Sequence, residues 1–295
     1  MAYQTGSLKN AADLIKQLIS VLQAKGWVVD KQTTSDTGQE WYIHNAAGAY
    51  YYIRGTSNTS AGTAVLYIAG NTGFDGTKEV FEQPGTTGQG WIYLGSEDDP
   101  VISYDAFITS RYCHVVVQTR QNFFNHFGFG VLDKEGDYAG GQYLYRGAQV
   151  MPFDHHDNVF DSYVRAELPG ETGLTAGWYP FRKTAPRAMG SGAPMFDSLH
   201  PDLLAIETSQ SALGGVLAPV PVAIYLTTAK KTNLRAGVVP DFCVCHMKGL
   251  TPRAKVEVNG EQWMVIPIAH LTLTKPEHWN YADSFTYAYA YRMNA

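Results

Sequence analysis

The sequence has few charged residues and no run of like charges. Asp, Glu, Lys and Arg make up 17% of the 295 residues, and the formal net charge is −5. An average soluble domain has roughly 25% charged residues. Direct nucleic-acid binding calls for a basic patch or stripe, so we expect none here. Few charges together with 19 tyrosines and 29 glycines predict that neighbouring subunits cover part of the surface.

Cysteines and long apolar runs are also scarce. Three cysteines (Cys113, Cys243 and Cys245) are too few for a disulfide framework, so we expect reduced, buried thiols. No apolar run approaches the roughly 20 residues of a membrane-spanning helix. The opening segment MAYQTGSLKN lacks the basic-then-apolar order of a signal peptide. We therefore expect no membrane span and synthesis in a cytoplasm.

Enzyme motifs are missing from the sequence. It has no Gly-x-Ser-x-Gly elbow, no phosphate-binding loop and no Gly-x-Gly-x-x-Gly opening a helix. Two acidic groups offer paired carboxylates for acid–base chemistry on sugars, but both lie at expected turns, where carboxylates are usually solvated. These groups are Glu97, Asp98 and Asp99, and Asp133, Glu135 and Asp137. The sequence predicts no enzyme, no catalytic residue and no cofactor.

Two clusters contain residue types that bind metals. The first has two imidazoles and two carboxylates in one loop: Asp154, His155, His156 and Asp157. Adjacent side chains point in different directions on most backbones, which favours a solvated loop. The second combines Cys243, Cys245 and His246, but it lacks the spacing of a zinc site, and buried thiols are the favoured interpretation. We expect no bound metal.

The longest stretch of two-residue periodicity, 101–132, predicts a central antiparallel hairpin. Residues 112–119 are mostly β-branched or aromatic, which favours an extended backbone. One face would carry Cys113, Val115 and Val117, and the other would carry Tyr112, His114 and Val116. In 123–131, phenylalanines on one face alternate with small residues on the other. The hairpin has no enzyme signature.

Other elements follow from local patterns. Apolar residues recur every three or four positions from Ser7, a plausible N-cap, to Lys25, which predicts a helix ending at Gly26. The segments that follow predict an antiparallel meander on which this helix packs. Asn259-Gly260 predicts a tight hairpin turn. The alternating tyrosines of 285–291 predict a sheet edge or a subunit contact.

These patterns predict an α+β chain, predominantly antiparallel β-sheet, with one N-terminal amphipathic helix and long irregular insertions. Three regions are expected. Residues 1–135 form a helix and an antiparallel sheet, and residues 136–201 form an irregular insertion rich in Gly, Pro and aromatic residues. Residues 202–295 form a β region that completes the core.

Aromatic residues scattered over irregular stretches are candidates for contacts between chains. Stretches 70–90 and 136–200 show too little periodicity for an internal sheet, and exposed apolar patches usually mark a partner. We expect these glycine-rich loops to become ordered on assembly. The interface candidates are Phe74, Phe81, Trp91, Tyr143, Tyr145, Phe153, Trp178, Tyr179, Phe181 and Phe196.

Three segments carry a resemblance to a known group of proteins. A short apolar helix ends in Gly26-Trp27 before the strand Trp41-Tyr42-Ile43. Arg111 precedes a hydrophobic run and then Phe127-Gly128-Phe129-Gly130, and a strand pair occupies 256–267. This order resembles the virion structural proteins of contractile-tailed bacteriophages, over the first half of the chain and its C-terminal end.

The resemblance implies a tail or baseplate component of the virion, synthesised in the host cytoplasm. Copies of the chain would form a symmetric ring around the tail axis, in contact with tube, sheath or hub proteins. No catalytic residue is implied. The first alternative is a receptor- or glycan-binding virion protein that uses exposed aromatics in loops 71–90 and 170–201. A further alternative is a glycan hydrolase that uses a carboxylate pair.

Overall fold

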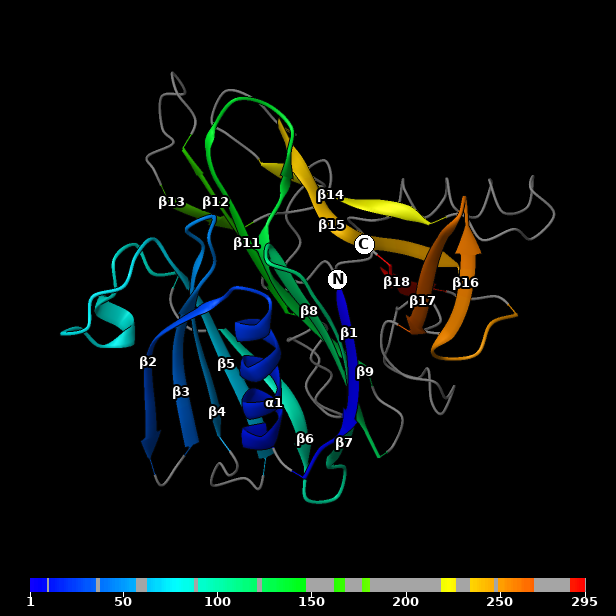
Figure 1. Cartoon of the computed structure of the whole chain (residues 1–295), viewed down its shortest axis with the longest axis horizontal. Coiled ribbons are helices and arrows are strands. Elements are labelled where there is room, and N and C mark those ends of the chain that lie inside the picture. Colours follow the sequence, from blue (N-terminus) through cyan, green and yellow to red (C-terminus); the bar gives the residue numbers. More distant parts are fainter. Residues whose placement is uncertain are drawn as a thin grey trace, which may run out of the picture.

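The computed structural model describes residues 1–9, 11–35, 38–56, 63–87, 90–120, 124–146, 162–167, 177–180, 219–226, 234–246, 249–267 and 287–294. Antiparallel strands dominate this part of the chain, together with one α-helix. The strands form three sheets, which follow one another across Figure 1: blue to cyan on the left, green in the middle, and yellow to red on the right. The expectation of a predominantly antiparallel β protein is confirmed.

The first outer layer is a five-stranded meander with the helix packed against it. Helix α1 (Ala11–Ala24) contacts this sheet and the neighbouring middle sheet. A short 3₁₀-helix, η1 (Val80–Glu82), lies along the chain between the fourth and fifth strands of this sheet. The strands, in spatial order, are β2 (Val28–Ser35), β3 (Gly38–His44), β4 (Tyr50–Thr56), β5 (Thr63–Asn71) and β6 (Gly90–Ser96).

The middle layer is a seven-stranded antiparallel sheet built around the predicted hairpin. Strands β8 and β9 pair antiparallel, with Tyr112 opposite Gly130 and Gln118 opposite Phe124, so the predicted hairpin is confirmed. In spatial order the strands are β1 (Ala2–Ser7), β7 (Val101–Ile108), β8 (Tyr112–Thr119), β9 (Phe124–Val131), β11 (Ala139–Arg146), β12 (Ser162–Glu167) and β13 (Gly177–Pro180).

The second outer layer is a six-stranded sheet whose strands, apart from a short one at 133–134, come from the C-terminal part of the chain. In spatial order its strands are β10 (Asp133–Lys134), β15 (Leu234–His246), β18 (Tyr287–Arg292), β17 (Glu261–Pro267) and β16 (Ala254–Val258). The sixth strand, β14 (Val220–Leu226), pairs with β15. Asn259 and Gly260 have φ values of 54° and 79° between β16 and β17. The predicted tight turn is confirmed, because left-handed conformations at both central residues define this hairpin class.

Alternation along β8 and β9 explains why the middle sheet is covered on both sides. Val115 and Phe127 belong to a core shared with α1 and the five-stranded sheet. Val116 and Phe124 point the other way, into a core shared with the six-stranded sheet. Because successive strand residues face opposite sides, a strand buried on both faces needs apolar residues at nearly every position. The two predicted faces of 112–119 are confirmed.

Helix α1 starts later than the sequence suggested. Ser7 is the last residue of β1, where it pairs with Ser103, and therefore does not cap the helix. The predicted helix end is confirmed. Gly26 has a φ of 86°, the Trp27 N–H donates to the Leu22 carbonyl, and the Gly26 N–H donates to the Gln23 carbonyl. This is the Schellman arrangement, which satisfies the last carbonyls of a helix.

The region expected to be an irregular insertion, 136–201, contains regular strands in its described parts. β11 pairs with β9 on one side and with β12 on the other. Within β11, Gly140 and Gly141 form a bulge with φ values of 104° and 96°. A glycine pair inside a strand accommodates such a bulge, so it does not end the sheet here.

The C-terminal tyrosines also differ from expectation. β18 lies between β15 and β17, so it is not a sheet edge. Tyr289 and Tyr291 are fully buried against the middle sheet, where Tyr291 stacks on Phe107 at 4.7 Å. Alternation alone marks the buried face of a strand without showing which layer covers it. In the described part of the chain, no helix is both long and apolar enough to cross a bilayer.

We predict that Leu18→Asp strongly destabilises the protein. Leu18 is 3% exposed within the core that joins α1 to the two sheets. An unpaired buried carboxylate costs several kcal/mol or takes up a proton. Urea denaturation should show a loss of about 3 kcal/mol or more. Ser20→Asp, on the exposed side of the same helix, is the matched control. Equal stability of the two variants would contradict this packing.

Candidate functional site

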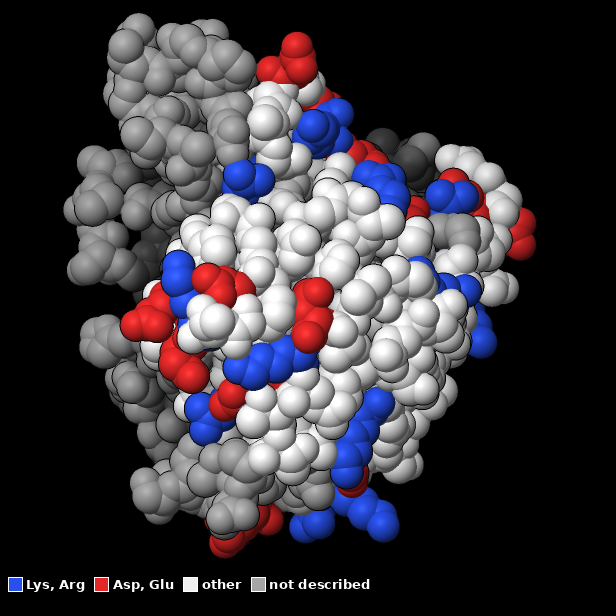
Figure 2. All heavy atoms as spheres, turned by 60° about the vertical axis from the view of Figure 1, so that its left-hand side comes forward, with Lys and Arg blue, Asp and Glu red and all other residues white. Residues whose placement is uncertain are grey.

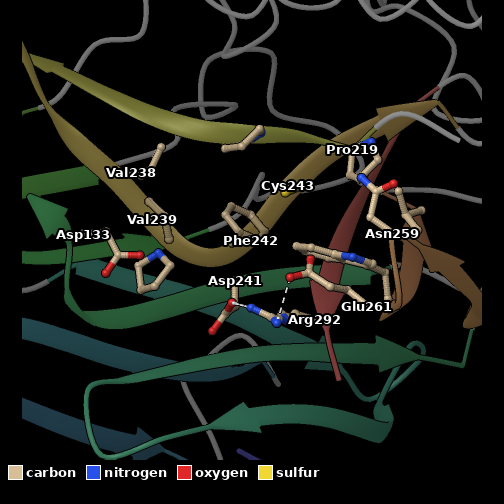
Figure 3. Close-up of a pocket in the computed structure, with 14 residues that line it drawn as sticks. Asp133, Pro219, Val238, Val239, Asp241, Phe242, Cys243, Asn259, Glu261 and Arg292 are labelled. Carbon is tan, nitrogen blue, oxygen red and sulfur yellow. Dashed lines mark hydrogen bonds and ion pairs between the residues drawn. The ribbon is translucent and has the colours of Figure 1, made fainter. Parts of the chain in front are cut away.

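Strand β15 changes its hydrogen-bonding partner part-way along its length. It pairs with β10 as far as Val238 and with β18 from Phe242 onwards. Its register against β14 also shifts within this interval. Pro240 lies in the interval, and proline has no N–H to donate to a ladder. β15 therefore bends around Pro240 and Asp241, and Figure 3 shows its ribbon curving there.

A cavity of about 330 Å³, here called the β15 pocket, opens beside this bend. Residues 238–243 form one wall, and Pro219 and Pro221 add apolar surface next to it. The remaining lining residues come from β10, the β16–β17 hairpin and β18. Figure 3 shows Asp133 at one end of the pocket and Asn259 at the other. Five separate segments of the chain therefore meet around one cavity.

The charged groups of the β15 pocket centre on Arg292. Its guanidinium lies 3.3 Å from Asp241 Oδ1 and 2.8 Å from Glu261 Oε1, and Figure 3 shows it between the two carboxylates. The Tyr112 hydroxyl, from β8, donates to Asp241 Oδ2 at 2.5 Å. Burial and this carboxylate raise the pKa of Tyr112, so its hydroxyl remains a donor. With Asp133 included, three carboxylates and one guanidinium line the pocket, which is therefore net acidic.

Two residues of the β15 pocket have an unusual backbone conformation. Asp241 and Asn259 both have a φ of 54°. Left-handed conformations are uncommon outside glycine, although Asp and Asn adopt them more readily than other residues. Asp241 is held there by its two side-chain partners. Such conformations cluster at binding and catalytic sites, where the surrounding structure maintains them.

His114 supports the bend from the middle sheet. Its Nε2 lies 2.9 Å from the Pro240 carbonyl oxygen, and its Nδ1 lies 2.9 Å from the Tyr145 hydroxyl. A carbonyl oxygen only accepts, so Nε2 carries the proton and Nδ1 accepts from Tyr145. Complete burial lowers the pKa of His114 to about 4, which keeps the ring neutral near pH 7.

His126, on the adjacent strand β9, makes an equivalent pair of contacts. Its Nε2 donates to the Pro267 carbonyl at 2.7 Å, and its Nδ1 accepts from the Tyr291 hydroxyl at 2.6 Å. Burial lowers its pKa to about 3. Two neutral histidines on neighbouring strands thus connect the middle sheet to the six-stranded sheet. His114 contacts the bend of β15, and His126 contacts the end of β17. These contacts are structural, and the contact between His114 and Pro240 holds the β15 wall of the pocket in place.

The sequence-based interface candidates are found in different surroundings. Phe81 is 65% exposed, whereas Phe74 is partly buried against Tyr42 at 5.1 Å. Tyr143 and Tyr145 are buried in the core between the middle and six-stranded sheets, so they are wrong as interface residues. For Trp91, Trp178 and Tyr179 the structure gives the backbone, in strands β6 and β13. Phe153, Phe181 and Phe196 lie outside the described residues.

The cysteines and acidic residues that the sequence marked as possible sites do not come together either. Cys243 and Cys245 share a face of the six-stranded sheet, whereas Cys113 lies in the core on the far side of the middle sheet. All three thiols are free and buried, as expected, and burial raises the pKa of Cys243 to about 12. Asp133 pairs with Arg111 at 2.9 Å. The acidic and histidine cluster at 154–157 lies outside the described residues.

Sequence reasoning missed the β15 pocket. Its charged residues were not recognised, apart from Asp133, which was read as a solvated carboxylate. The segment Val-Pro-Asp-Phe at 239–242 carried one usable signal, because a proline inside an apolar run indicates a bulge or bend. Comparison of the chain with protein families and with curated proteins finds no match.

The two buried histidines predict acid sensitivity. Their pKa values of about 4 and 3 in the folded protein lie below the ordinary 6.5, so the unfolded chain binds protons more tightly. Their stabilising contribution is complete above about pH 6.5 and decreases as the pH falls towards 4 and then 3. For His114 alone the loss at pH 4 is roughly 3 kcal/mol.

We therefore predict that unfolding free energy, measured by urea denaturation, falls steeply between pH 6.5 and 4.5. The variants His114→Gln and His126→Gln should each flatten this slope, because glutamine keeps an N–H near Nε2 and does not titrate. His44→Gln, at a partly exposed histidine on the outer sheet, is the control for the same substitution made outside the buried sheet. Identical slopes in the unaltered protein and the three variants would show that the buried histidines do not cause the fall in unfolding free energy.

Proposed function

We propose that this chain is a structural subunit of a bacteriophage tail or baseplate that assembles with copies of itself in a ring around the tail axis and with neighbouring tube, sheath or hub proteins. It is synthesised in the host cytoplasm and resides in the virion. This role needs no catalytic step. The observation that carries the proposal is the outward-facing Phe81 on loop 72–87, one of the segments that the sequence assigned to contacts between chains.

Loop 72–87 is held in shape by its own hydrogen bonds. Gln83, 3% exposed, accepts from the Asp75 N–H and donates to the carbonyls of Asp75 and Lys78. The Thr72 N–H donates to the Pro84 carbonyl at 2.8 Å, which closes the base of the loop. These bonds order the loop without a partner chain, contrary to the expectation that it becomes ordered on assembly. A contact made here would therefore not incur a large entropy cost.

The loop is also fixed to the sheet below it. Phe74 and Val80 pack on Tyr42 and Tyr52, which lie on the outer face of the five-stranded sheet. Phe81 follows directly and turns away from this cluster, with 65% of its surface exposed. It is the most exposed large hydrophobic side chain in the described part of the chain. An anchored loop that presents an aromatic ring to solvent has the form of a contact element.

The side of the molecule that carries the loop has wide areas without charge (Figure 2), although exposed Lys78, Glu79 and Glu82 flank Phe81 itself. Figure 2 shows the side of the molecule that carries this loop, where charged side chains gather in a few groups and wide areas carry none. Interface cores are depleted in charged residues. The low overall content of charged residues, 17%, agrees with this picture.

We predict that Phe81→Ser strongly reduces assembly without unfolding the protein. Replacing an exposed side chain should change stability by no more than about 0.5 kcal/mol. Loss of one aromatic anchor should reduce incorporation into tail particles at least tenfold, equivalent to about 1.4 kcal/mol. Ile102→Ser, at another exposed hydrophobic residue, 38% exposed on β7, is the matched control. Incorporation is measured by quantitative mass spectrometry of purified particles.

Two results would contradict the proposal. The first is absence of the unaltered chain from purified particles. The second is normal incorporation of Phe81→Ser. Particles that assemble normally with Phe81→Ser but no longer adsorb to host cells would support a receptor- or glycan-binding role, because an exposed ring also stacks on sugars.

A further inference from the structure

The six-stranded sheet ends at an unpaired edge, strand β16. In the described part of the chain β16 pairs only with β17, and Figure 1 shows it at the right-hand margin of this sheet. Gln262 of β17 directs its N–H to Asn294 and its C=O to Met293, away from β16. Glu257, opposite Gln262, and Lys255, two residues earlier, therefore turn their own N–H and C=O groups towards the free edge. Such an edge is a template for another strand.

The side chains of β16 alternate between two faces. Val256 and Val258 are half-buried and pack on the cluster that contains Trp263. Lys255 and Glu257 are exposed on the other face, and neither makes an ion pair with another described residue. The free edge thus presents one positive and one negative side chain on one face, and an apolar strip on the other.

This arrangement of charges is complementary to itself. When two copies of β16 pair antiparallel about a two-fold axis at Val256, Lys255 of each copy lies opposite Glu257 of the other. Both pairs have backbone groups that face the free edge, so each pair exchanges both of its N–H···O bonds. An axis at Lys255 or at Glu257 would instead place two like charges opposite each other, which is destabilising. Charge therefore selects the register centred on Val256.

A lysine on an edge strand usually discourages pairing with another chain. In the register centred on Val256 the opposite charge is supplied by the second copy, and each such cross-strand pair contributes roughly 0.2–1 kcal/mol. The two Val256 side chains meet on the apolar face, beside the cluster that contains Trp263. All three contributions favour the same register: main-chain hydrogen bonds, charge and apolar contact.

We propose that β16 is a docking edge for a second copy of this chain, and that the two six-stranded sheets join there into one continuous sheet. The ring proposed above uses head-to-tail contacts, whereas this contact relates two copies by a two-fold axis, so it is an additional contact. It lies on the six-stranded sheet, and Phe81 lies above the five-stranded sheet. Either contact can therefore fail while the other holds.

The first test is a cross-link in the full chain. In the variant Val256→Cys the two introduced thiols face each other at the axis, in a pair whose Cα atoms are about 4.5 Å apart and within disulfide range. The three native thiols are buried. We expect mild oxidation by copper phenanthroline to give a covalent dimer on a non-reducing gel. Val258→Cys is the matched control, because its thiols would be roughly 14 Å apart.

The second test exchanges charges and measures self-association by sedimentation equilibrium, over about 10 to 500 μM protein. Lys255→Glu and Glu257→Lys should each weaken the dimer at least tenfold, because every dimer contains the altered pair twice. A mixture of these two variants restores opposite charges across the axis and should dimerise like the unaltered chain. Glu40→Gln, at a carboxylate paired with Arg54 on the five-stranded sheet, should have no effect.

Three results would overturn the proposal. One is a protein that stays monomeric throughout this concentration range and gives no cross-link with Val256→Cys. Another is a cross-link that forms equally well with Val258→Cys, which would indicate a different register or random collision. The third is self-association that the charge variants leave unchanged; if Phe81→Ser abolishes it, the contact is the one at loop 72–87 instead. Incorporation into particles is not measured here, so failure leaves the assembly role unaffected.

Discussion

The middle sheet is buried on both of its faces, and the rest of the molecule depends on that burial. Strands β8 and β9 have almost no exposed residue, so water cannot solvate any polar group there. Each polar side chain in these strands must find a partner inside the protein. His114 and His126 do so with proline carbonyls of the six-stranded sheet. These pairings fix the outer sheet to the middle sheet in one register, in addition to apolar contact, which is less directional.

Asp105 shows the same constraint for a full charge. Its carboxylate is completely buried on β7, and Arg253, from the loop before β16, lies 2.7 Å away. The same guanidinium reaches Gln118 and Ser103 on the middle sheet, and Arg253 adopts a left-handed φ of 63°. Removing one partner of such a buried pair typically costs 3–5 kcal/mol, because the other charge remains in the interior. The carboxylate thus fixes where a distant loop must lie.

Local chemistry could be predicted from the sequence, whereas layer assignment could not. The hairpin of β8 and β9, the end of α1 and the Asn259-Gly260 turn follow from periodicity and turn residues within short windows. β1 was missed because its Thr, Gly and Ser residues suggest a loop or a helix cap, and its strand character depends on pairing with β7. Tyr143 and Tyr289 were placed at surfaces because alternation does not reveal a second covering sheet. The β15 pocket is assembled from segments far apart in the chain, so no local pattern encodes it.

The pairing of β1 with β7 has a consequence for the order of folding. The two strands are adjacent in space, yet α1 and all five strands of the first outer sheet lie between them in the chain. That intervening meander makes mostly neighbour-to-neighbour contacts, which close short loops and form early. β1 must then wait, unpaired, until β7 has been synthesised. Folding of the helix and the meander brings β1 and β7 close together. The first outer layer therefore has to form before the edge of the middle sheet can be completed.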